Sequence, residues 1–132
     1  MRVVHLIGAC ASLHITAVGK LFLLEDGPVN SRQYATRTGL PVYTKNTVPD
    51  FASLTKELDR ICKLGNALDN EEAEKGVSCI GAGIYDDEGR LVAGLSLSAP
   101  STRLDKAWGQ RVKEVADAIS RAIGWRAGDR AT

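Results

Sequence analysis

Apolar residues recur at helical spacing in the middle of the chain, between Asp50 and Leu64. The repeat of three and four residues is typical of an amphipathic helix with one buried face. Asp50 stands where a side chain can cap the first turn, and Gly65 stands where a helix ends. The apolar positions are Phe51, Leu54, Leu58, Ile61 and Leu64. The pattern predicts a helix that covers a sheet.

A second helical pattern runs from about Asp105 to Ile123 and stops at Gly124. Asp117 stands four residues before Arg121, a spacing that supports an exposed helical face. We expect this helix also to lie on a sheet. The side chains expected in its buried face are Trp108, Val112, Val115, Ile119 and Ile123.

Two strand-like runs lie between these helices, and a turn rich in acids and glycine joins them. Such a turn between two apolar runs predicts a β-hairpin. The segments are Val77–Tyr85, the turn Asp86–Gly89, and Arg90–Ser98. Shorter helical pieces are expected near Thr16–Glu25 and Asn30–Thr38, with a candidate strand at Val3–Ile7. The predicted class is α+β, an antiparallel sheet with amphipathic helices packed on it.

The hairpin has two faces if Tyr85 lies opposite Arg90. One face is aliphatic, because that register pairs Ile84 with Leu91, Ala82 with Ala93, and Ile80 with Leu95. The other face is small or weakly polar, with Cys79 opposite Ser96, Val77 opposite Ser98, and Gly81 opposite Gly94. Two interpretations remain open for this second face. It is either a solvent-facing surface or a hollow, left by Gly81, Gly83 and Gly94, in which a thiol and hydroxyls bind a polar ligand.

The composition is that of one soluble domain. The 132 residues carry 17 basic and 16 acidic side chains, and no basic block stands out, so we expect no direct nucleic-acid binding. Three cysteines without metal-ligand spacing argue against a disulfide framework and a zinc site, and favour a reducing, cytoplasmic compartment. No apolar run is long enough to span a membrane, and the apolar stretch before Cys10 is too short for a secretion signal.

Two further segments contain groups that could bind a ligand or take part in catalysis. Leu68–Glu72 offers carboxylates for catalysis or a metal ion, although a solvated loop is the simpler interpretation, and only His5 and His14 could assist a metal. The start of the helix after Thr16 presents unpaired N–H groups, which suit a carboxylate.

Five segments, in order, resemble the effector-binding domain of IclR-type bacterial transcription regulators. The stretches that carry the resemblance are His14–Lys20 (HITAVGK), Gly39–Thr44 (GLPVYT), Leu68–Glu72 (LDNEE), Gly76–Ile80 (GVSCI) and Leu95–Leu104 (LSLSAPSTRL). Their spacing matches the family's throughout. The chain departs from the family's pattern at Ser12, Asn70 and Ala99, and the first two of these positions adjoin the ligand site that the resemblance implies.

The resemblance implies a GAF-like effector-binding domain over residues 1–125, incomplete at its N-terminal side, followed by a flexible tail at 126–132. It implies a small-molecule effector, a carboxylate by preference, and no cofactor or metal. The effector would be held by the backbones of Ala17, Val18 and Asp69 and by the side chains of Cys79, Ser96 and Ser98. We expect this chain to lack the winged helix-turn-helix of these regulators and to form a homo-oligomer.

Two other functions stay open at this point. The chain could be a GAF-like sensor module outside transcription. It could also be an enzyme in which Cys79 is a nucleophile assisted by His14 and Asp69, although nothing in the sequence brings His14 to the thiol. We expect no enzyme activity.

Overall fold

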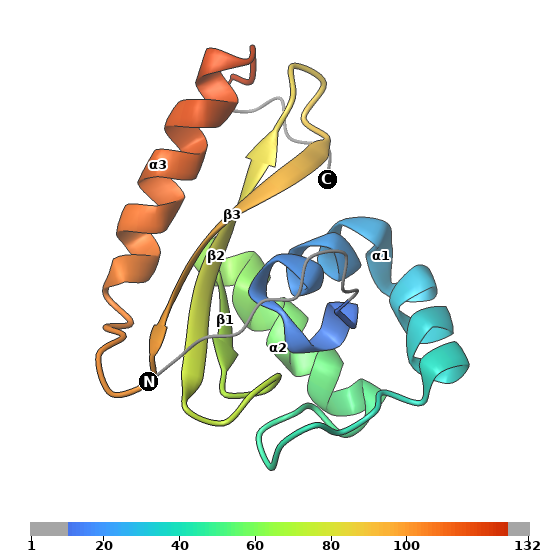
Figure 1. Ribbon diagram of the computed structural model, residues 1–132. Helices are drawn as coiled ribbons and strands as arrows, with labels where there is room; N and C mark the ends of the chain where they lie inside the picture. The colour runs from blue at the N-terminus through green and yellow to red at the C-terminus, as the bar shows by residue number, and fades with distance from the viewer. Residues whose placement is uncertain (1–10, 127–132) are drawn as a thin grey trace.

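The computed structural model describes residues 11–126, which form a sheet with helices on both faces (Figure 1). The sheet is antiparallel in the order β1 (Ala67–Asn70), β2 (Val77–Tyr85) and β3 (Leu91–Pro100). A single helical turn (Leu13–Ile15), α1 (Ala17–Thr38) and α2 (Phe51–Leu64) cover one face, and α3 (Trp108–Ala122) covers the other. This confirms the predicted α+β class. The expectations for Val3–Ile7 and for the tail after Arg126 lie outside the described residues.

Helix α2 begins and ends as its sequence predicts. The Asp50 side chain accepts a hydrogen bond from the backbone N–H of Ser53 at 2.8 Å. Gly65 ends the helix in the left-handed conformation, with φ 78°. Leu54, Leu58 and Ile61 are buried against α1 and the sheet. Local capping and the apolar stripe together fix this element.

Helix α1 consists of two pieces joined at a kink, as expected. The Thr16 side chain accepts from the N–H of Gly19 at 3.0 Å and caps the start. Gly27 leaves the helical conformation at φ 89°, and Pro28 opens the second piece. Proline is favoured there because the first residues of a helix need no N–H donor. None of the helices within residues 11–126 is both long and apolar enough to cross a membrane.

Helix α3 differs from the prediction in its start and in its buried face. It begins at Trp108 rather than near Asp105. Of the five side chains expected in its buried face, Val112 alone is buried, whereas Trp108 is 37%, Val115 51%, Ile119 38% and Ile123 50% exposed. The residues that face the sheet are Gly109, Val112, Ala116 and Ser120.

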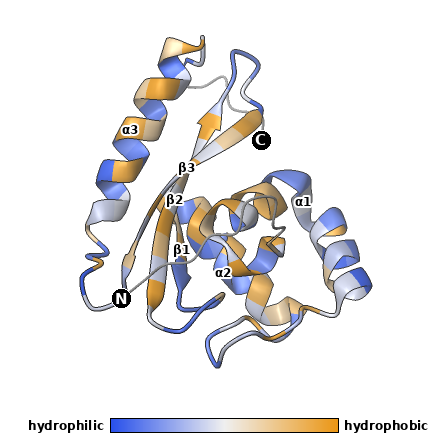
Figure 2. Ribbon diagram, viewed as in Figure 1, coloured by the Kyte–Doolittle hydropathy of each residue, from blue (hydrophilic) through white to orange (hydrophobic). Residues whose placement is uncertain are grey.

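Small side chains explain that choice of face. A Cβ at Gly109 would lie 2.9 Å from the amide oxygen of Asn66, so glycine allows the helix to approach the start of β1. The Ser120 hydroxyl accepts from the backbone N–H of Tyr85 at 2.9 Å and donates to the Ala116 carbonyl. Only Val112 of the apolar stripe of α3 is therefore used in the core, and the other four side chains are exposed. Figure 2 shows the apolar positions that recur along the helix.

The hairpin register is shifted by two residues from the one expected. The turn closes between Asp86 and Arg90, whose carbonyl accepts from the Asp86 N–H at 3.0 Å. Tyr85 consequently pairs with Leu91, and a bulge at Ile84/Tyr85 adds the second residue of shift. The observed pairs include Ile80 with Leu97, Ala82 with Leu95, Gly83 with Gly94, and Cys79 with Ser98. A shift of two keeps each residue on its face, so the two-faced character of the hairpin survives.

Leu91 is the exception to that rule. The bulge moves it to the face of Cys79, where it packs with the core formed by α1 and α2. The aliphatic residues Ile80, Ala82 and Ile84 form the second core with Val112 and Ala116.

Candidate functional site

Three of the predicted ligand residues form one row across the sheet. Asp69 of β1 pairs with Cys79 of β2, and Cys79 pairs with Ser98 of β3. Ser96 lies in the neighbouring row, opposite Gly81. Since side chains alternate between the faces of a strand, these residues share the face that α1 and α2 cover. The sequence assigned Cys79, Ser96 and Ser98 to one face correctly, although it paired Cys79 with the wrong serine.

The start of α1 packs on two glycines of the same face, close to this row. A Cβ at Gly81 would be 3.1 Å from the Ala17 Cβ, and a Cβ at Gly94 would be 2.5 Å from the Val18 Cγ1. Glycine is needed at both positions because the helix packs directly on the strand backbone. The two remaining predicted residues, Ala17 and Val18, are thereby placed beside Cys79 and its neighbours.

The same contacts correct the expectation that the glycines of this face leave a hollow. The three glycines were expected to leave a hollow, but Val18 fills the space at Gly94, and the side chains of Leu91 and Tyr85 fill the space at Gly83. The glycines therefore serve close packing rather than an open floor. The accessible polar groups are the Ser96 and Ser98 hydroxyls at the outer strand and the half-buried Cys79 thiol.

The thiol and the hydroxyl of the row are in contact. Cys79 Sγ lies 3.0 Å from Ser98 Oγ. Burial raises the pKa of the Cys79 thiol, and the nearby Asp69 carboxyl raises it further. The thiol is therefore protonated at neutral pH, which makes it a weak hydrogen-bond donor and a poor nucleophile.

Asp69 is buried, which contradicts the interpretation of its segment as a solvated loop. Its side chain is 4% exposed and accepts from the backbone N–H of Glu72 at 2.8 Å. Burial raises the pKa of Asp69 to about 6, and the charge of Glu72 acts in the same direction. The segment begins as strand β1 and ends in a turn that holds the Asp69 carboxyl in place.

A fully buried lysine anchors this region, and the sequence analysis missed its role. Lys20 donates to the Leu68 carbonyl at 2.8 Å and to Glu72 at 2.9 Å, and it forms a longer ion pair with Glu57 at 3.3 Å. These bonds tie α1 to α2, to β1 and to the acidic turn. Lys20 stands three residues from both Ala17 and Leu23, on the buried stripe of α1, and this was the signal that could have identified it.

His14 is buried and both of its ring nitrogens are engaged. Nε2 donates to the Pro41 carbonyl at 2.9 Å, so Nδ1 accepts from the Tyr34 hydroxyl, also at 2.9 Å. These contacts fix the loop after α1 against the helical turn before it. An imidazole held in this way has no free nitrogen for the Cys79 thiol, which removes the base that the cysteine-enzyme hypothesis needs.

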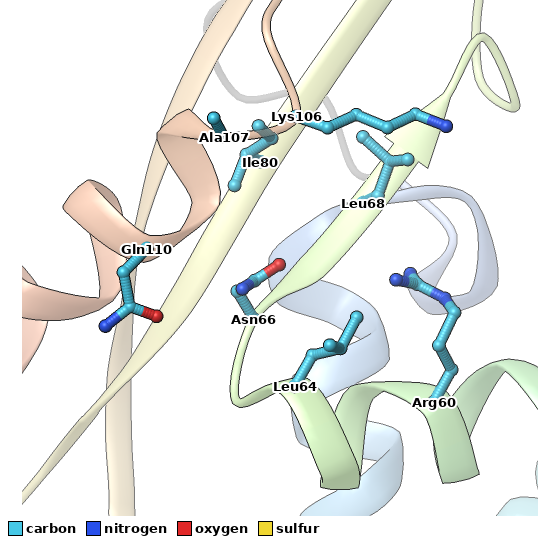
Figure 3. Close-up of a pocket in the computed structure, with 8 residues that line it drawn as sticks. All are labelled: Arg60, Leu64, Asn66, Leu68, Ile80, Lys106, Ala107 and Gln110. Atoms are coloured by element: carbon cyan, nitrogen blue, oxygen red, sulfur yellow. The ribbon is translucent and has the colours of Figure 1, made fainter.

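A separate cleft lies between α2, β1 and the start of α3 (Figure 3). It has a volume of about 300 Å³, an apolar floor that includes Leu68 and Ile80, and Arg60 and Lys106 at its rim. Arg60 is paired with Glu57 at 2.6 Å. None of the six predicted ligand residues lines this cleft. Within residues 11–126, no three His, Cys, Asp or Glu side chains gather to hold a metal ion.

Residues 1–125 match the family of bacterial transcriptional regulator IclR C-terminal domains. The chain belongs to the IclR family. The match covers nearly the whole chain and confirms the resemblance seen in the five sequence segments. The IclR family is one of transcription regulators and not of enzymes, as expected.

Relatives and solved structures agree with this assignment. The chain is 35% identical over 125 residues to the HTH-type transcriptional repressor AllR of Escherichia coli (strain K12), covering 92% of the chain and 46% of AllR. The Thermotoga maritima IclR crystal structure is 34% identical, with a TM-score of 0.82 over 93% of the chain and 51% of that protein. The chain thus spans about half the length of these relatives.

A more distant structure shows the same fold with a ligand. An IclR homologue from Microbacterium hydrocarbonoxydans, complexed with 4-hydroxybenzoate, is 22% identical with a TM-score of 0.78. It covers 91% of this chain, which covers 50% of the homologue. At that identity the likeness concerns the fold alone.

Proposed function

We propose that this domain senses a small organic acid on behalf of an IclR-type transcription regulator. The observation that supports the proposal is the packing of the α1 start on Gly81 and Gly94. These glycines lie on the same face of the sheet as the row of Asp69, Cys79 and Ser98. The proposed ligand contacts are the backbones of Ala17, Val18 and Asp69 and the side chains of Cys79, Ser96 and Ser98.

The chemistry of the face favours an anion. No residue between 11 and 126 accepts a hydrogen bond from the N–H of Ala17 or Val18, and the positive end of the helix dipole lies there. The exposed hydroxyls of Ser96 and Ser98 are able to donate to a second oxygen of the ligand. The neutral thiol of Cys79 adds no repulsion. A small carboxylate would use all of these groups.

The negative charge of Asp69 opposes the binding of an anion at this site. Its pKa of about 6 leaves the carboxyl largely ionised at pH 7, and Lys20 offsets part of that charge. The contact assigned to Asp69 is accordingly through its backbone. Ligand affinity for an anion should rise as the pH falls through 6, because the protonated carboxyl no longer repels it.

Sensing in this proposal means that the ligand favours one of two arrangements of the complete regulator. DNA contacts belong to parts of the regulator outside this domain, and the domain acts in the cytoplasm as a homo-oligomer. The candidate effectors are short oxo-acids, aromatic acids and sugar acids. The complex of the Microbacterium homologue with 4-hydroxybenzoate supports including the aromatic acids.

The test is a thermal-shift screen with glyoxylate, 4-hydroxybenzoate and gluconate as probes, followed by calorimetry. A ligand at 100 times its dissociation constant should stabilise the domain by about 2.7 kcal/mol. Replacing both Ser96 and Ser98 with Ala should weaken binding by about 1–3 kcal/mol, with the same melting temperature in the absence of ligand. Thr102→Ala, at an exposed position of the loop after β3, is the matched control.

Two outcomes would contradict the proposal. A screen in which no carboxylate shifts the melting temperature would reject the ligand class. Unchanged affinity in the double serine variant would remove those hydroxyls from the site and place the ligand elsewhere.

A further inference from the structure

The cleft between α2, β1 and the start of α3 lies outside the proposed effector site. It is on the opposite face of β1 from Asp69, because Leu68 points to the α3 side of the sheet and packs with the second core. Leu64, Leu68 and Ile80 form its apolar wall. Helix α3 packs mainly on β2, so the side chain of Leu68 on the short strand β1 is only partly covered.

Two cations line this cleft, and Figure 3 shows Leu68 between their charged ends. Arg60 donates to Glu57 through Nε and Nη2, which leaves its Nη1 amino group without a partner among the described residues. The Lys106 ammonium forms no ion pair with any side chain of residues 11–126. Positively charged donors on both sides of an apolar wall are thus available to a ligand.

The carboxylates near the cleft already have cations of their own. Past Arg60 the cleft continues into a second hollow of about 390 Å³, which Glu57 and Glu72 line. Glu57 pairs with Arg60 at 2.6 Å, and Glu72 pairs with the buried Lys20 at 2.8 Å. The charge of Lys106 is therefore in excess, and it favours an anion in the cleft.

We propose that this cleft is a second small-molecule site, which binds an organic anion with an apolar body and one carboxylate. The apolar body lies on Leu64, Leu68 and Ile80, and the carboxylate lies between Lys106 and Arg60. Ligand sites combine an apolar wall with a few polar groups in this way. At roughly 30 Å³ for each water-sized group, the volume of about 300 Å³ holds about ten non-hydrogen atoms, the size of a monocyclic aromatic acid.

The experiment is a titration of the nitrogen-15-labelled 132-residue chain with phenylacetate, followed by amide chemical shifts. The shifts should change at residues 60–68, 80 and 106–110. Phenylacetamide has the same shape without the charge, and it should bind more weakly. Replacing both Ser96 and Ser98 with Ala should leave the shift changes in the cleft as they are in the wild type.

Two variants test the groups assigned to the carboxylate. Lys106→Gln removes the unpaired cation at an exposed position and should weaken phenylacetate binding by about fivefold. Leu64→Glu, at a 51% exposed position, places a negative charge beside the carboxylate and should weaken binding by more than about tenfold. Arg121→Gln removes one positive charge in the last turn of α3, away from the cleft, and is the matched control. It should bind phenylacetate as the wild type does.

The outcomes separate this proposal from the proposed effector site. Shift changes confined to residues 17–18, 69, 79 and 96–98 would overturn the second site and support the first. A titration without any shift change in the cleft, or equal affinity for phenylacetamide, would also overturn it. So would an affinity that Lys106→Gln or Leu64→Glu leaves unchanged.

Discussion

Replacing Asp69 with Asn should stabilise the domain at neutral pH and leave it unchanged in acid. The Asp69 carboxyl is buried and accepts a hydrogen bond from the Glu72 N–H through Oδ1. Asparagine keeps an acceptor oxygen at that position and removes the negative charge. The substitution therefore isolates the cost of burying the charge.

The magnitude follows from the pKa of Asp69. Folding raises it to about 6, whereas an unfolded aspartate has a pKa near 3.9. A difference of about 2 pKa units corresponds to about 3 kcal/mol. Between these two pKa values, the folded state binds one more proton than the unfolded state. The contribution of protonated Asp69 to the free energy of unfolding is therefore fully favourable below pH 4, and it is lost as the pH rises through 6. The aspartate thus costs stability at pH 7, and the asparagine variant avoids that cost.

The assay is urea unfolding of wild type and Asp69→Asn between pH 4 and pH 8. The variant should match the wild type near pH 4 and exceed it by up to about 3 kcal/mol above pH 7. Asp59→Asn, at an exposed position of α2, is the control and should show no such difference. A variant that is less stable than the wild type at pH 7.5, or a constant difference across the range, would refute the reasoning.

Three other variants or reagents test the packing of the site. Lys20→Met leaves buried carboxylates without their cation and should lower the free energy of unfolding by about 3–5 kcal/mol in urea titrations; an unchanged midpoint would contradict this. Gly94→Ala places a Cβ against Val18 and should cost about 1–3 kcal/mol, and adding Val18→Ala should recover part of that loss. Iodoacetamide should alkylate exposed Cys62 before Cys79, whose pKa burial raises, and equal rates by peptide mass spectrometry would argue against that difference.

Local signals in the sequence determined several elements correctly. Asp50 and Gly65 define the ends of α2, and the alternation along the hairpin defines its two faces. These features depend on residues that are near each other in the chain, such as a cap and the N–H that it accepts from. The five family segments likewise identified the IclR family, because ordered motifs need no knowledge of contacts. The six ligand residues remain a proposal that rests on that resemblance and on their proximity.

Tertiary contacts decided what the pattern alone left open. The apolar stripe of α3 predicted Val115 and Ile119 in the core, but Gly109 and Ala116 allow a closer approach to the sheet and were selected instead. The register depended on a bulge at Ile84/Tyr85, which alternation does not reveal, since a shift by two preserves the faces. Lys20 is buried because carboxylates 37 and 52 residues away in the chain surround it. Periodicity tells which residues are able to be buried, whereas only the fold brings together the partners that make burial favourable.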